Sequence, residues 1–168
     1  MAITKLVRDL MRIGVVTCQA DTSLVEAVRT LLREDLESLI ILGDNSHAVG
    51  MLSRREAVAV YGQSGADVQD VRTLTVADAM NPDIPEVPPD IPAAAAAQIM
   101  LDRGIREIYL MHHGGGGSWP AAVLRFEDIL RYLSAESEAD VADLGAGAPR
   151  TSPIEAFMER YKRPIDQA

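Results

Sequence analysis

The pentapeptide VRDLM at residues 7–11 returns as VADAM at residues 76–80, and the two copies stay in register without a gap up to residues 42 and 111. Over those 36 paired positions six are identical, and the apolar positions follow the same helix-then-strand periodicity in both copies. An internal period of this length is typical of two copies of one supersecondary unit. A unit of about 60 residues buries little apolar surface by itself, so we expect the copies to pack face to face around a shared core. A small ligand would then bind in the crevice between them.

The composition restricts the class of protein. The 168 residues are 48% hydrophobic and carry a net charge of −9, which argues against nucleic acid as a partner. No apolar run is long enough for a membrane span, and the first 20 residues contain no signal-peptide core. The single cysteine, Cys18, excludes an internal disulfide and suits a reducing compartment. We therefore predict a soluble, cytoplasmic protein with no nucleic-acid and no membrane partner.

The first copy predicts the element order β-α-β-β-α. Ser23 and Glu26 have the spacing of a helical capping box, and apolar residues then recur with helical period over residues 24–34. Residues 38–42 and 48–52 are apolar runs of strand length, separated by turn-forming residues. Residues 54–61 are predicted as a second helix.

The second copy has the same order, with helices predicted at 93–103 and 126–133 and strands at 107–111 and 121–124. Its hairpin, residues 112–119, is three residues longer and contains four consecutive glycines. We predict a flexible extended hairpin there, because no Lys-Ser/Thr follows to make a phosphate-binding loop. We predict no metal site, since His112 and His113 are adjacent on a strand and point to opposite faces.

These patterns predict an α/β fold of two pseudo-symmetric units packed through their sheets. The first unit spans residues 1–62, a linker 63–70 and the second unit 71–134. Residues 135–152, acidic and then rich in Gly, Ala and Pro, indicate a flexible connector. Residues 153–168 are predicted as a short C-terminal helix and tail, because apolar residues recur there at helical spacing.

Residues 4–134 resemble the CBS domain, named after cystathionine β-synthase, in two copies. The resemblance is carried by the Asp-x-Met turns at 9–11 and 78–80, the Asp-x-Ser-Leu-x-Glu-Ala sequence at 21–27, and the Gly-x-x-Ser-x-x-Glu sequence at 50–56. Two CBS domains in tandem resemble a Bateman module. The resemblance implies a regulatory protein that binds an adenine nucleotide or adenosyl ligand (AMP, ADP, ATP or S-adenosylmethionine) between the units. It also implies a homodimer.

In the first copy, the resemblance implies that Ser53 and Glu56 hold the ribose hydroxyls of such a ligand, with Glu56 where the family has Asp. A hydroxyl and a carboxylate one helical turn apart can both bond to a cis-diol. Arg54 or Arg55, at the start of the helix, could meet a phosphate. The same Ser53-x-x-Glu56 spacing is also that of a capping box that needs no ligand.

The second copy departs further from the family, because Asp128 remains but Arg125 stands where the hydroxyl residue should be. Arg125 is either an anion ligand in the cleft or a solvated residue near a helix start. The adenine contacts that the resemblance implies come from the segments after the Asp-x-Met turns, which contain Val15, Val16, Ile84 and Pro85.

The leading interpretation is a non-enzymatic regulatory module that requires no cofactor and controls a partner protein that the sequence does not identify. The rival is a homodimeric interaction scaffold whose nucleotide site has decayed. No nucleophile, base and orienting group assemble in the sequence, and Asp9 and Asp78 are interpreted as helix caps and not as an acid/base pair. An enzyme is therefore the third choice.

Overall fold

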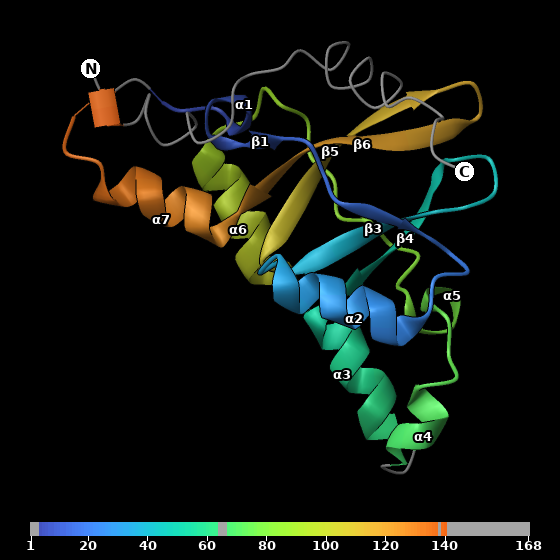
Figure 1. Ribbon diagram of the computed structural model, residues 1–168. Coiled ribbons are helices and arrows are strands. Elements are labelled where there is room, and N and C mark those ends of the chain that lie inside the picture. The colour runs from blue at the N-terminus through green and yellow to red at the C-terminus, as the bar shows by residue number, and fades with distance from the viewer. Residues whose placement is uncertain (1–3, 64–66, 138, 141–168) are drawn as a thin grey trace, which may run out of the picture.

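The computed structural model describes residues 4–63, 67–137 and 139–140, and contains two three-stranded sheets with helices on their outer sides (Figure 1). The predicted helix that begins near residue 153 lies outside the described residues. In chain order the elements are α1 (Val7–Leu10), β1 (Arg12–Ile13), β2 (Thr17–Gln19), α2 (Leu24–Arg33), β3 (Ser38–Leu42), β4 (Ala48–Ser53), α3 (Arg54–Gln63), α4 (Val68–Val71), α5 (Val76–Ala79), α6 (Ala93–Arg103), β5 (Glu107–Gly114), β6 (Gly117–Arg125) and α7 (Phe126–Ser134).

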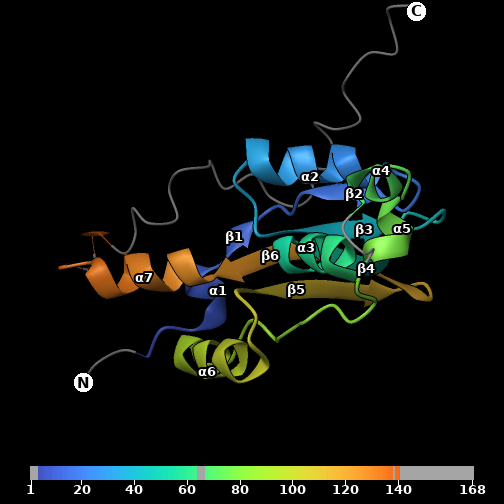
Figure 2. The ribbon, with the colours of Figure 1, turned by 90° about the horizontal axis from the view of Figure 1, so that it is seen from below.

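The two sheets have the strand orders β2-β3-β4 and β1-β6-β5, which confirms the predicted α/β fold. Figure 2 shows α2 on one side of the stacked strands and α6 on the other. A central apolar cluster joins the sheets, and its buried members are Ile40, Met51, Tyr109, Met111 and Val123. Each sheet also has an apolar cluster of its own, which lies between the sheet and the helices that cover it. The shared core expected of two small units is therefore the layer between the sheets.

The Asp-x-Met turn of each repeat packs against the other repeat. After α1, β1 pairs antiparallel with β6, with Arg12 opposite Val123. After α5, Asn81 makes the corresponding antiparallel bridge to Met51 of β4. Helix α1 packs in the core of the second repeat, and α5 packs in that of the first. Each packed half therefore contains a segment from the other copy of the sequence.

The aspartates of these turns cap their own helices, as predicted. The Asp9 carboxylate accepts a hydrogen bond from the backbone N–H of Leu6, and Asp78 accepts one from that of Thr75, each 2.8 Å long. The bonds from Thr75 lower the pKa of Asp78. Such caps fix the entry of each short helix, from which the chain crosses to the other repeat.

The long hairpin of the second repeat is more regular than predicted. Strands β5 and β6 continue through residues 112–114 and 117–119, and only Gly115 and Gly116 form the turn. Both have positive φ angles, 55° and 83°, as tight hairpin turns require, and glycine adopts them without strain. Within the described residues, no helix combines the length and apolar character that crossing a bilayer would require.

Candidate functional site

A cavity of about 590 Å³ lies between the two repeats. The first repeat supplies residues from the start of β3, from β4 and from the first turn of α3, including Ser53, Arg55 and Glu56. The second repeat supplies the segment that crosses after α5 and the turn between α6 and β5, including Pro85 and Arg106. The cavity is therefore built by both copies, at the place where the sequence predicts a ligand.

Ser53 and Glu56 meet at the start of α3, because β4 ends at Ser53 and the helix follows at once. Glu56 Oε2 accepts a hydrogen bond from the Ser53 backbone N–H at 3.0 Å and also contacts the Ser53 hydroxyl. The hydroxyl in turn accepts the Glu56 N–H at 3.3 Å. This is a reciprocal capping box, yet both side chains line the cavity. The cap holds the hydroxyl and the carboxylate side by side, facing the space a ligand would fill.

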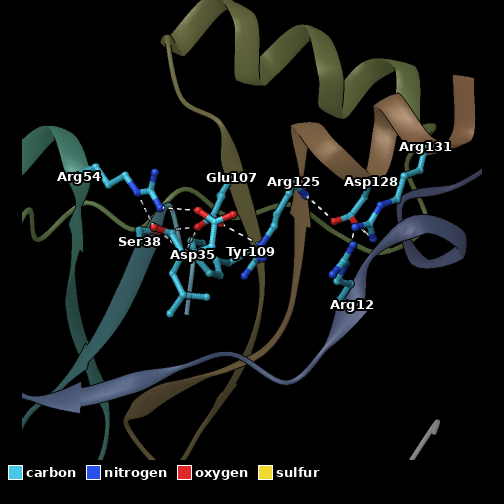
Figure 3. A network of polar contacts seen from close by, with 10 residues as sticks. Arg12, Asp35, Ser38, Arg54, Glu107, Tyr109, Arg125, Asp128 and Arg131 are labelled. Atoms are coloured by element: carbon cyan, nitrogen blue, oxygen red, sulfur yellow. Dashed lines mark hydrogen bonds and ion pairs between the residues drawn. The ribbon is translucent and has the colours of Figure 1, made fainter. Parts of the chain in front are cut away.

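Arg54 and Arg55 take different directions from the same helix start. Arg55 lines the cavity, and its guanidinium lies near Gly104, at 4.0 Å from where a Cβ on that glycine would be. Arg54 instead bonds the Leu36 carbonyl through Nε and the Asp35 carboxylate through Nη2, each at 2.8 Å, and is not among the cavity residues (Figure 3). Of the two predicted phosphate ligands, only Arg55 is therefore placed to reach a ligand in this cavity.

The predicted adenine contacts are divided in the same way. Pro85 lines the cavity, and its carbonyl accepts the Tyr109 N–H at 2.9 Å. Val15 and Ile84 pack against the cluster between the sheets, and Val16 packs beneath α2. These three side chains therefore shape the core around the cleft, and only Pro85 lies on the wall of this cavity.

Figure 3 shows a buried polar network, two members of which, Ser38 and Glu107, line the cavity. Glu107, 3% exposed, accepts hydrogen bonds from the Ser38 hydroxyl at 2.6 Å and from the Tyr109 hydroxyl at 2.8 Å. Its other oxygen lies 3.0 Å from Arg125 Nε in an ion pair without hydrogen-bond geometry. Burial and the adjacent Glu107 charge raise the pKa of Tyr109 well above its usual value, so this hydroxyl stays protonated and donates.

The sequence interpretation missed this network, although the repeat contains a signal for it. Ser38 and Glu107 are 69 residues apart and so occupy the same position in the two copies. Two copies that pack face to face bring one such pair together at their local symmetry axis. A polar residue at that position in both copies, within otherwise apolar strands, would have predicted the contact.

The cavity carries charges of both signs. Its carboxylates belong to Glu37, Glu56, Asp83 and Glu107, and its guanidinium groups to Arg55, Arg103 and Arg106. Asp83 and Arg103 form an ion pair at 2.5 Å. Burial raises the pKa of Glu37, and the nearby Arg106 charge opposes that effect. The walls are therefore polar and close to electrically balanced.

The corresponding carboxylate in the second repeat, that of Asp128, is bound by other side chains of the protein. Asp128 Oδ2 accepts the backbone N–H of Arg125 at 3.0 Å, which repeats the carboxylate part of the Ser53–Glu56 cap. Asp128 Oδ1 accepts a bond from Arg12 Nε at 2.6 Å, and the Asp128 side chain is only 4% exposed. Arg125 turns its guanidinium to Glu107. The structure therefore gives the two second-repeat candidates internal ionic partners.

A second cavity, of about 680 Å³, opens between the tips of the two hairpins. It is lined mainly by glycines and small polar residues together with His47 and His113, and it contains none of the predicted ligand residues. His47 stacks edge-on against Trp119 there, and His113 pairs with Glu86. Its larger volume does not make it the better candidate, because it has no pair of groups suited to a ribose or a phosphate. Across the described ranges, no three or more His, Cys, Asp or Glu residues cluster in a way that could hold a metal ion.

Comparison with solved structures agrees with this architecture. A CBS-domain containing protein from Agrobacterium tumefaciens is 20% identical, with a TM-score of 0.65 over 76% of this chain and 98% of that one. The CBS domain pair of protein MJ0100, in complex with 5′-methylthioadenosine and S-adenosyl-L-methionine, is 19% identical, with a TM-score of 0.62 over 77% and 99%. CBSX2 in complex with AMP is 20% identical, with a TM-score of 0.61 over 76% and 95%. Because these identities are low, the structural similarity establishes the fold of this chain and not its ligand.

Comparison of sequences assigns the family. No curated protein sequence gives a significant match. The sequence model of the CBS domain matches twice, at residues 7–62 and 76–135, and so covers more than half of the chain. The two matches coincide with the two copies of the internal repeat. The chain therefore belongs to the CBS domain family, as a tandem pair.

Proposed function

We propose that this protein is a regulatory module that binds an adenine nucleotide or adenosyl ligand in the cavity between its repeats. The observation that carries the proposal is the pairing of Ser53 and Glu56 on one wall with the Pro85 segment of the other repeat across about 590 Å³. Structures of the same fold bound to AMP and to S-adenosylmethionine support that ligand class. Because both repeats line the cavity, a ligand there would favour one relative placement of the repeats over others.

The charges of the cavity favour ligands with few phosphates. Arg55 and Arg106 are the cations available to an anion, because Arg103 already pairs with Asp83. Glu37 and Glu56 lie on the same walls and would repel a polyphosphate. We therefore expect 5′-methylthioadenosine, S-adenosylmethionine or AMP to bind more tightly than ATP.

Ligand binding should raise the thermal unfolding midpoint of the wild type and not that of a Ser53→Ala/Glu56→Ala variant. At about 100 times its dissociation constant, a ligand adds roughly 2.7 kcal/mol. For a chain of this size that is a rise of roughly 5–10 °C. The measurement is differential scanning fluorimetry against AMP, ADP, ATP, S-adenosylmethionine and 5′-methylthioadenosine, each variant being compared with its own ligand-free midpoint.

The matched control is Thr75→Ala/Asp78→Ala, which removes a capping box of the same chemistry from α5, outside the cavity. This variant should keep the full ligand-induced rise. If no compound shifts the wild type at millimolar concentration, the proposal fails for this panel. The interaction scaffold then becomes the better function, and the internally paired Asp128 in the second repeat already favours that alternative.

We further propose that the module is a homodimer, regulates a separate partner protein and acts in a reducing cytoplasm. Corresponding positions of the two repeats expose large apolar side chains on their outer helices. Leu32 and Leu101 are 68% and 64% exposed, and Val58 and Leu130 are 69% and 61% exposed. Exposed apolar groups that recur on both halves suit a surface that a second copy covers.

Leu130→Glu/Leu133→Glu should convert the dimer to a monomer, because both side chains are exposed on α7 and charges there would be buried on association. Sedimentation velocity across a concentration series measures the change, and circular dichroism checks that the fold is kept. Val68→Glu, at an exposed apolar position on α4, should stay dimeric. A wild type that sediments as a monomer at every concentration contradicts the proposal.

A further inference from the structure

The two halves of the module are not equivalent as binding sites. The repeat offset of 69 residues places Arg12 where the second copy has Asn81. Beyond the hairpin, three residues longer in the second copy, Asp128 takes the position of Glu56. A symmetric module would therefore have a second cleft at Arg12 and Asp128, related to the cavity at Asn81 and Glu56.

Strand β1 places Arg12 at that second cleft. The pairing of Arg12 with Val123 sets its side chain beside the turn from β6 into α7, where Asp128 lies. Its Nε then donates to Asp128 Oδ1 at 2.6 Å, and the other Asp128 oxygen is used by the helix cap. Arg131 Nη1 lies 4.0 Å from the same Oδ1. Both oxygens of this carboxylate thus have partners from the chain itself.

Asn81 does not close the first cleft in this way. Its backbone bridges to Met51, as that of Arg12 does to Val123, but its shorter side chain turns back and accepts the Asp83 N–H at 3.0 Å. The Glu56 carboxylate is left on the cavity wall together with Asn81. Three exchanges at corresponding positions distinguish the two clefts: Asn81 for Arg12, Ser53 for Arg125 and Ala59 for Arg131. Of the three arginines, Arg12 is the one whose side chain hydrogen-bonds to the Asp128 carboxylate.

We propose that Arg12 is a built-in occupant of the second cleft, so that each chain binds one adenosyl or nucleotide ligand and not two. The proposal rests on the proposed function for the first cleft. It assigns to Arg12 the ionic contact with Asp128 that a ligand's hydroxyl groups would otherwise make. Shortening Arg12 should leave Asp128 Oδ1 with only the 4.0 Å ion pair to Arg131, which is too long for a hydrogen bond, and so create a second site on the same chain.

The test is equilibrium dialysis with AMP and, separately, with S-adenosylmethionine on the full chain. The wild type should bind one equivalent per chain, Ser53→Ala/Glu56→Ala none, and Arg12→Ala two. Arg12→Ala in the Ser53→Ala/Glu56→Ala background should bind one. Arg12→Lys, which keeps a cation for Asp128, should stay at one. Arg12→Asn, which copies Asn81, replaces the alanine variant if circular dichroism shows that the latter does not fold.

The outcomes separate this inference from the proposed function. Two equivalents on the wild type, or no gain from Arg12→Ala and Arg12→Asn, would overturn the inference while the first cleft remains a ligand site. No binding to the wild type would remove the proposed function for these probes. In that case, one equivalent on Arg12→Ala still supports Arg12 as the occupant, and none overturns it.

Discussion

Arg125→Met is expected to lower the free energy of unfolding by about 3–5 kcal/mol at neutral pH, the cost of breaking a buried ion pair from one side. Glu107 is 3% exposed, and Arg125 Nε, 3.0 Å from its Oε1, is the cation that balances it. The hydroxyls of Ser38 and Tyr109 donate their hydrogen bonds to the other oxygen of Glu107, Oε2. Methionine replaces the length of the arginine stem and not its charge, so a buried carboxylate would be left uncompensated.

A double-mutant cycle with Glu107→Gln separates this ionic effect from lost packing. Glu107→Gln/Arg125→Met leaves neither charge unpaired, and it should be clearly more stable than Arg125→Met alone. Urea denaturation at neutral pH of the wild type, the two single variants and the double variant gives all four free energies of unfolding. Additive losses would mean that the two side chains act independently and that the network is not ionic.

The elements of the fold were predictable because each repeat has clear local signals. Ser23 and Glu26 mark the start of α2, and the predicted strand at 38–42 and helix at 93–103 have the bounds the structure gives them. The exchange of the Asp-x-Met turns was not predictable in the same way. Strand β1 has only two residues, too few to show a period, and its partner β6 is more than 100 residues away.

The candidate site was predictable only for groups that a local motif places. The Ser53-x-x-Glu56 spacing sets a hydroxyl beside a carboxylate through a helix cap, and the structure has that cap on the cavity wall. The directions of Arg54 and Arg12 depend on Asp35 and Asp128, which other elements supply. Local sequence motifs do not predict contacts between distant elements. A comparison of corresponding positions in the two repeats would have predicted several of these contacts.

Gly50→Val is expected to lower the free energy of unfolding by about 3 kcal/mol, near the upper end of the usual cost of overpacking. A Cβ at Gly50 would lie 2.7 Å from the Asn81 carbonyl oxygen and 3.0 Å from Met80 Sδ. That carbonyl accepts the Met51 N–H at 2.8 Å, so moving it away also weakens the bridge that holds the crossing segment. Gly50→Ala, with fewer methyl groups, should cost less.

Gly62→Ala is the matched control, since nothing lies within 4 Å of a Cβ built on this glycine of α3. Alanine there should stabilise the protein by about 0.5–1 kcal/mol, because it restricts the unfolded chain more than glycine does. The midpoint and slope of guanidinium denaturation measure both effects. Alanine is compatible with the strand itself, as Ala122 at the corresponding position of the second repeat is 3% exposed. An unchanged midpoint for Gly50→Val would therefore mean that the Asn81 segment does not lie against β4, and the first cleft would lose one of its walls.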